Sequence, residues 1–149
     1  MTLLSRIYEE LSELERIVGR IHKAWDSFLT KGDELYFDSV ALNLHGFYSC
    51  LERIFELIAR NVDQSIPTGD SWHQELLKQM ATEIRQVRPS IISRDTFILL
   101  DEYRGFRHVV RNVYTFNLSE KKLRPLVIDL QKLYLQIKKE LLTFLELFK

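Results

Sequence analysis

The side chains best suited to chemistry lie between Tyr103 and Tyr114. Three arginines and one histidine occur within the eight residues from Arg104 to Arg111, and no Asp or Glu stands between Arg104 and Tyr114. Guanidinium groups match the geometry of phosphate oxygens, and imidazole exchanges protons near neutral pH. The composition therefore predicts an anion site with proton-transfer chemistry beside it.

Helical spacing gathers these groups on one face. At about 100° per residue, polar side chains fill one arc of the helix and apolar ones fill the opposite arc. The polar arc consists of Tyr114, Arg107, Arg111, Arg104, His108 and Asn112. Any surface helix has a charged face, so this periodicity also fits a solvated surface. The missing carboxylates favour the anion site, because i,i+4 partners would otherwise relieve the repulsion between the arginines.

Apolar residues at three- and four-residue steps predict the helix that carries these groups, from about Thr96 to Phe116. The same spacing predicts further helices over about Thr2 to Phe28, Asp33 to Val62, a shorter stretch from Ser71 to Val87, and Leu123 to Phe148. Gly32 and Asp33 predict a stop followed by a restart, and the short link makes the first two helices antiparallel.

Local signals mark several of the expected helix ends. Ser71 to Gln74 fits a capping box, and Ser93 or Asp95 can cap the next helix. Pro125 either marks the true start of the last helix or kinks it. No alternating strand pattern or repeat competes with these helices. We therefore predict one all-α domain over residues 1–149, an antiparallel up-down bundle of four long helices plus one short helix.

Composition excludes several classes of function. With 21 basic and 21 acidic residues the chain has no net charge, so an anion-binding surface must be local. Cys50 is the single cysteine, which excludes an intramolecular disulfide and a cysteine-cluster metal site, and a buried, inert thiol is expected. His73 and Glu75 do not share a helical face, so no metal site is predicted there. The sequence contains no phosphate-binding glycine motif, and we predict no cofactor.

The N-terminal residues lack the pattern of a secretory signal, and no apolar run approaches the roughly 20 residues that span a bilayer. A cytoplasmic protein without membrane contact is therefore expected. In the second helix, His45 and Tyr48 are expected to be partly buried residues with satisfied hydrogen bonds. Glu52 and Glu56 are expected to make ordinary surface pairs.

The motif Arg-His-x-x-x-Asn-x-Tyr on the fourth helix of a domain of this length resembles the HEPN superfamily, particularly the HepT-like toxins. The sequence from Leu42 to Arg53 is also similar to that of a HepT-like branch. The family pattern is an Arg, a polar residue, three variable residues, a His, one residue and often a Tyr. On this chain it selects Arg107, His108, Asn112 and Tyr114, whereas an alternative register uses Arg104 and His108.

The resemblance implies metal-independent cleavage of RNA, with transfer RNA among the candidates, at a cleft between the motif helices of a homodimer. Arg107, with Arg104 or Arg111, would hold the scissile phosphate, and His108 would move the proton. HepT-like toxins pair with a MntA-like nucleotidyltransferase antitoxin that adenylylates the motif tyrosine, here Tyr114. AMP at that position would add negative charge beside the arginines and could close the cleft.

One departure from the pattern leaves alternatives open. Asn112 stands where the family has its catalytic histidine, and an amide cannot titrate near neutral pH. The chain could therefore keep the fold and the basic cleft as an RNA- or nucleotide-binding or nucleotidyltransferase-partner module without efficient cleavage. A third reading, a plain dimer or solvent face, would be favoured if the arginines paired with Glu52 or Glu56.

Overall fold

The computed structural model describes residues 2–112 and 119–149, and the side chains of residues 108–112 lie outside the description. The described ranges contain five α-helices and no strand, which confirms the all-α prediction. The helices are α1 (Leu3–Lys31), α2 (Glu34–Ile58), α3 (Trp72–Met80), α4 (Arg94–Asn112) and α5 (Glu120–Leu145). The π-helical turn η1 (Ala59–Asp63) extends α2, and the 3-10 turn η3 (Glu146–Phe148) follows α5.

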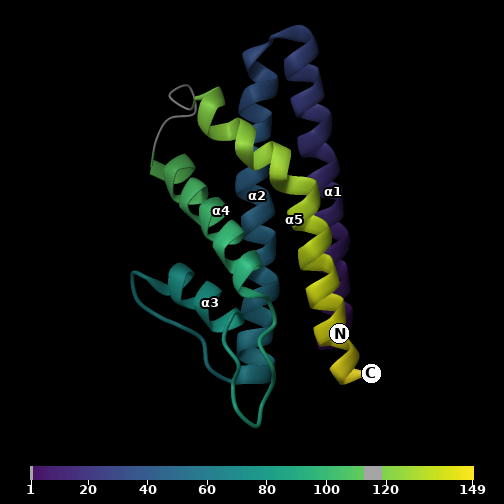
Figure 1. Cartoon of the computed structure of the whole chain (residues 1–149), viewed down its shortest axis with the longest axis vertical. Coiled ribbons are helices and arrows are strands. Elements are labelled where there is room, and N and C mark those ends of the chain that lie inside the picture. Colours follow the sequence, from purple (N-terminus) through teal and green to yellow (C-terminus); the bar gives the residue numbers. More distant parts are fainter. Residues whose placement is uncertain (1, 113–118) are drawn as a thin grey trace.

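The four long helices run alternately up and down, and short α3 lies between α2 and α4 at one end of the bundle (Figure 1). Helix α2 packs against α1, α3 and α4, and α5 packs against α1 and α4. The core forms where the predicted apolar stripes meet, with fully buried Ile7, Leu14 and Ile21 on α1 facing Leu44, Leu51 and Ile58 of α2. Burial of each such side chain stabilises the fold by about 1.5–3 kcal/mol.

The turn between α1 and α2 has the predicted glycine stop and aspartate restart. Gly32 adopts a left-handed conformation with φ 68° and donates its N–H to the Phe28 carbonyl at 2.8 Å. Asp33 then caps α2, because its carboxylate accepts the Leu35 N–H at 2.9 Å. A left-handed residue ends a helix without strain only when it is glycine, so this position reverses the chain.

Helix α3 ends at Met80, so the prediction that it reaches Val87 is wrong. The reason is the buried guanidinium of Arg88, which pairs with Asp63 at the end of η1 and turns residues 81–90 back toward α2. The Met80 carbonyl then accepts the Ile91 N–H at 2.9 Å, in place of a partner further along a helix. The predicted cap at Ser71 also fails, since its side chain makes no capping hydrogen bond.

The start of α4 agrees with the sequence, whereas its predicted end at Phe116 lies outside the described residues. Ser93 caps α4 by accepting the Thr96 N–H at 3.2 Å. Ser119 caps α5 by accepting the Lys122 N–H at 3.3 Å, so the last helix begins before Pro125. Proline inside a helix removes one hydrogen bond and clashes with the preceding turn. Pro125 therefore lies inside α5 and does not mark its start, and Figure 1 shows that α5 bends along its length.

Candidate functional site

Helix α4 is fixed to the bundle by its apolar arc. Tyr103 and Phe106 are buried, and the Tyr103 hydroxyl donates to the Leu126 carbonyl of α5 at 2.6 Å. The Tyr103 ring also packs against Phe47 of α2, with ring centroids 5.6 Å apart. This anchoring leaves Arg104 and Arg107 half-buried on the other arc, as the helical spacing predicts. These contacts fasten the stretch of α4 that carries Arg104 and Arg107 to α2 and α5.

The two arginines have different neighbours. Arg107 donates its Nε hydrogen to the hydroxyl of Ser49 on α2 at 3.3 Å. Arg104 donates to Asp101 on its own helix at 2.7 Å, one turn earlier. Among the side chains that the structure describes, no carboxylate pairs with Arg107. This arginine is thus a half-buried cation whose neighbour is a neutral hydroxyl, which leaves guanidinium donors for an anion.

Glu52 does not pair with the arginines, and it is not a surface residue as predicted. Its carboxylate is buried and lies 2.6 Å from Nδ1 of His73 on α3. The His73 ring in turn stacks on Trp72, with centroids 3.7 Å apart. A buried carboxylate needs such a partner because desolvation of an unpaired charge is costly. The third reading is favoured if Arg104, Arg107 and Arg111 pair with Glu52 or Glu56. Neither Arg104 nor Arg107 pairs with these glutamates, and the side chain of Arg111 lies outside the description.

Tyr48 also departs from expectation. It is fully buried, and within the described chain its hydroxyl has no hydrogen-bond partner, whereas a satisfied hydroxyl was predicted. Burial raises the pKa of the Tyr48 phenol well above its ordinary value of 10.0, Glu52 raises it further, and Arg104 acts in the opposite direction. The hydroxyl therefore stays protonated and is a donor without an acceptor. Nearly all buried polar groups in folded proteins have a hydrogen-bond partner, so this hydroxyl is an exception.

Comparison with protein families gives the decisive observation. A family model described as "HepT-like protein" matches residues 39–148, which cover most of the chain, including α3, α4 and α5. The chain belongs to the HepT-like family. Comparison with curated proteins and with solved structures found no match. The matched range contains both the α4 motif and the Glu52 to His73 contact.

Some motif residues of this HepT-like chain lie outside the description. The backbone of α4 extends through His108, Arg111 and Asn112, but their side chains are not described, and Tyr114 lies outside the described residues altogether. The roles assigned to these four residues stay predictions. Arg104 and Arg107 are the two motif-region arginines whose contacts are known.

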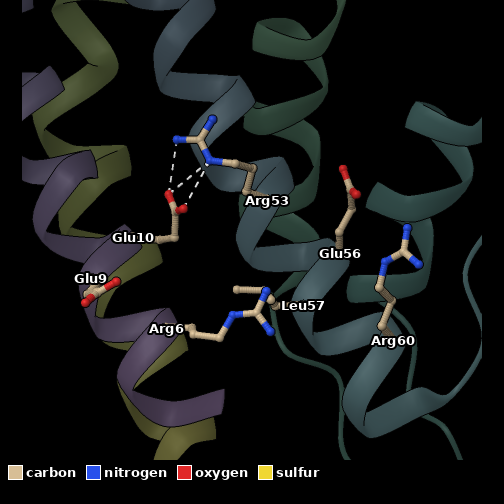
Figure 2. A pocket seen from close by; sticks show the side chains of 7 residues that line it. All are labelled: Arg6, Glu9, Glu10, Arg53, Glu56, Leu57 and Arg60. Carbon is tan, nitrogen blue, oxygen red and sulfur yellow. Dashed lines mark hydrogen bonds and ion pairs between the residues drawn. The ribbon is translucent and has the colours of Figure 1, made fainter. Parts of the chain in front are cut away.

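A second charged surface of the HepT-like chain was not predicted. Figure 2 shows a pocket of about 300 Å³ between α1 and α2, lined by Arg6, Glu9, Glu10, Arg53, Glu56, Leu57 and Arg60. Arg53 reaches from α2 to both carboxylate oxygens of Glu10, at 3.2 and 3.1 Å. Three glutamates balance three arginines here, so the pocket has no net attraction for a phosphate.

The thiol of Cys50 lies beside this pocket and is inert, as predicted. It is buried and donates to the Glu10 backbone carbonyl at 3.3 Å. Burial raises the pKa of the thiol to about 12, and the hydrogen bond to Glu10 contributes to the rise. The thiolate is therefore scarce at neutral pH.

Two further classes of site find no support in the residues described. Across 2–112 and 119–149, His, Cys, Asp and Glu nowhere gather in a group of three that could hold a metal ion. In the same ranges, no helix combines the length and hydropathy that crossing a membrane requires.

Proposed function

We propose that this HepT-like protein is a cytoplasmic toxin of a toxin–antitoxin pair, a homodimeric, metal-independent endoribonuclease that a MntA-like nucleotidyltransferase silences by adenylylating Tyr114. The observation that carries the proposal is the position of Arg107. Its guanidinium is half-buried against Ser49 without a carboxylate partner in the described chain, and Arg107 is the first residue of the Arg-His-x-x-x-Asn-x-Tyr sequence that resembles the family motif. A cation in this state stabilises a phosphate that docks on it.

The residues divide the reaction between them. Arg107, helped by Arg104 and Arg111, binds the scissile phosphate and stabilises the charge that develops on it. His108 takes the proton of the ribose 2′-hydroxyl, the 2′-oxygen attacks phosphorus, and the bond from phosphorus to the 5′-oxygen breaks. The products are a 2′,3′-cyclic phosphate and a 5′-hydroxyl, whose oxygen takes its proton from a protonated histidine, since the homodimer carries two copies of His108. No step requires a metal ion or a cofactor.

Cleavage of transfer RNA in the presence of a chelator tests the proposal. A charge-assisted hydrogen bond is worth about 1.5–3 kcal/mol, so Arg107→Ala should lower the rate roughly 10- to 100-fold. His108→Ala should abolish the reaction. The matched control is Arg16→Ala, because Arg16 is an exposed arginine of α1 whose partner is Glu13. Cleavage that survives both motif substitutions unchanged would reject the assignment.

Asn112 favours a second candidate, a binding module that has lost efficient cleavage. This candidate predicts that RNA or the nucleotidyltransferase binds without product formation, in a way that Arg107→Ala and added salt both weaken. Asn112→His separates the two candidates because it restores the titratable group of the family pattern. An increase in cleavage supports a nuclease scaffold, whereas a variant that binds RNA without cutting it supports the binding module.

A further inference from the structure

The pair formed by Glu52 and His73 lies outside the family motif and has the geometry of an acid–base dyad. Glu52 is 4% exposed as a residue, and its Oε2 lies 2.6 Å from His73 Nδ1. The His73 side chain is 22% exposed, and Nε2 has no hydrogen-bond partner among the described residues. We propose that His73, oriented by Glu52, is a second proton-transfer residue of the α4 site and supplies the titratable group missing at Asn112. This inference rests on the proposed function.

The dyad and the arginines are positioned at neighbouring levels of α2. Ser49, which contacts Arg107, and Glu52, which contacts His73, are three residues apart, or about 4.5 Å along the helix axis. Helix α4 runs in the opposite direction to α2 (Figure 1). Moving from Ser49 to Glu52 along α2 is therefore moving in the same direction as from Arg107 to Arg104 along α4. Arg104 therefore stands at the level of the dyad.

The buried Tyr48 hydroxyl lies on the same stretch of α2, one residue before Ser49 and one turn before Glu52. Burial raises the pKa of this phenol, and the charge of Glu52 raises it further. The hydroxyl has no partner among the described residues, so this stretch of helix holds an unused donor. The cluster thus combines phosphate ligands with a proton carrier.

The tautomer follows from the contact with Glu52. A carboxylate that accepts the Nδ1 hydrogen leaves the lone pair of neutral imidazole on Nε2. Nε2 can take the proton of a ribose 2′-hydroxyl as the 2′-oxygen bonds to phosphorus and the 5′-oxygen departs. In this refinement of the proposed function His73 replaces His108 as the base, and His108 in its protonated form supplies the proton to the 5′-oxygen. Glu52 acts through His73 and is a positioning residue.

A structural role for the pair predicts something different. If the contact merely fastens α3 to α2, a side chain that keeps the hydrogen bond should preserve both stability and activity. Glutamine fits this purpose at position 73, because its amide can donate to Glu52 but cannot titrate. Glu75→Gln is the control, since Glu75 is an exposed residue of the same helix.

The experiment measures cleavage of transfer RNA against pH for the full chain and its variants, with thermal unfolding alongside. We expect His73→Gln to lower the rate on the order of 100-fold and to remove one limb of the pH profile, with an unfolding midpoint close to wild type. Glu52→Gln should lower the rate less, and His73→Gln combined with Asn112→His should recover at least part of the loss. Glu75→Gln should change nothing.

Three results would overturn the inference, and they are distinguishable. Unchanged cleavage and pH dependence in His73→Gln would reject His73 while leaving the nuclease intact. Absence of cleavage in wild type and in Asn112→His alike would reject the proposed function and this inference with it. A loss of rate in His73→Gln that follows a large drop in the unfolding midpoint would assign the pair a structural role.

Discussion

Replacing Arg88 by methionine should destabilise the protein strongly, because this guanidinium is the centre of a buried hydrogen-bond network. Its Nε and one terminal nitrogen donate to the two oxygens of Asp63, at 2.6 and 2.7 Å. The remaining hydrogens go to the backbone carbonyls of Thr82, Pro89 and Gln79, at 2.9, 3.0 and 3.1 Å. The side chains of Arg88 and Asp63 are 1% and 0% exposed, so water cannot replace these bonds.

The size of the effect follows from what the substitution leaves behind. Methionine fills the space of the arginine stem but strands the Asp63 carboxylate, whose remaining side-chain donor is Gln79 at 2.8 Å. Removing one partner of a buried ion pair typically costs about 3–5 kcal/mol. For a chain of 149 residues, this corresponds to a drop of roughly 6–20 °C in the unfolding midpoint. Such a loss is a large share of the stability of a typical domain.

Urea unfolding followed by circular dichroism measures the effect. The midpoint should fall in Arg88→Met with little change in the m value, and Arg85→Met should stay near wild type because Arg85 is exposed on the same turn. The double variant Arg88→Met with Asp63→Leu should recover much of the loss, since both charges are then gone. A loss below about 1 kcal/mol in Arg88→Met, or no recovery in the double variant, would refute the reasoning.

Three further predictions concern stability. Tyr48→Phe should stabilise the fold by about 1 kcal/mol, because it removes a buried hydroxyl without a partner in the described chain. If thermal unfolding showed the variant to be less stable than wild type, the hydroxyl would have an acceptor and the reasoning would be wrong. Gly32→Ala should lower stability by about 1 kcal/mol in urea unfolding because φ is +68°, whereas Gly19→Ala, inside α1 with open space around it, should raise it. The free energy of unfolding should fall as pH rises from about 9 toward 10, because the unfolded Cys50 thiol ionises while the folded one, with its pKa raised to about 12, keeps its proton; above pH 10 the unfolded Tyr48 phenol adds to the fall, since burial raises its folded pKa as well. A Cys50→Ala variant that loses stability as steeply as wild type between about pH 9 and 10 would contradict the thiol as the cause.

The helices were predictable because their signals are local. Apolar residues at helical spacing and the pair Gly32 and Asp33 act within one or two turns, and each appears in the structure where the pattern places it. The end of α3 was not predictable, because it depends on Arg88 meeting Asp63, 25 residues earlier. The missing capping hydrogen bond at Ser71 was not predictable either, because a motif of four residues does not outweigh tertiary packing.

The candidate site also has features that the sequence predicts and features that it does not. The arginine row of α4 could be read from the sequence, and so could the apolar arc that holds it in the bundle. The burial of Glu52 could have been predicted, since it lies among the apolar core positions of α2. A buried carboxylate requires a partner, so the existence of a partner could have been predicted as well. The identity of that partner could not be deduced, because His73 is 21 residues away and beyond a turn.

The sequence by itself determined the all-α fold, the direction changes between the long helices, and the placement of Arg104 and Arg107 on one face, because helical periodicity and capping depend on neighbours along the chain. The tertiary structure alone decided which polar groups meet. Ser49 lies 58 residues from Arg107, and Glu52 lies 21 residues from His73. Such contacts depend on how helix faces dock, and packing against apolar neighbours settles that docking.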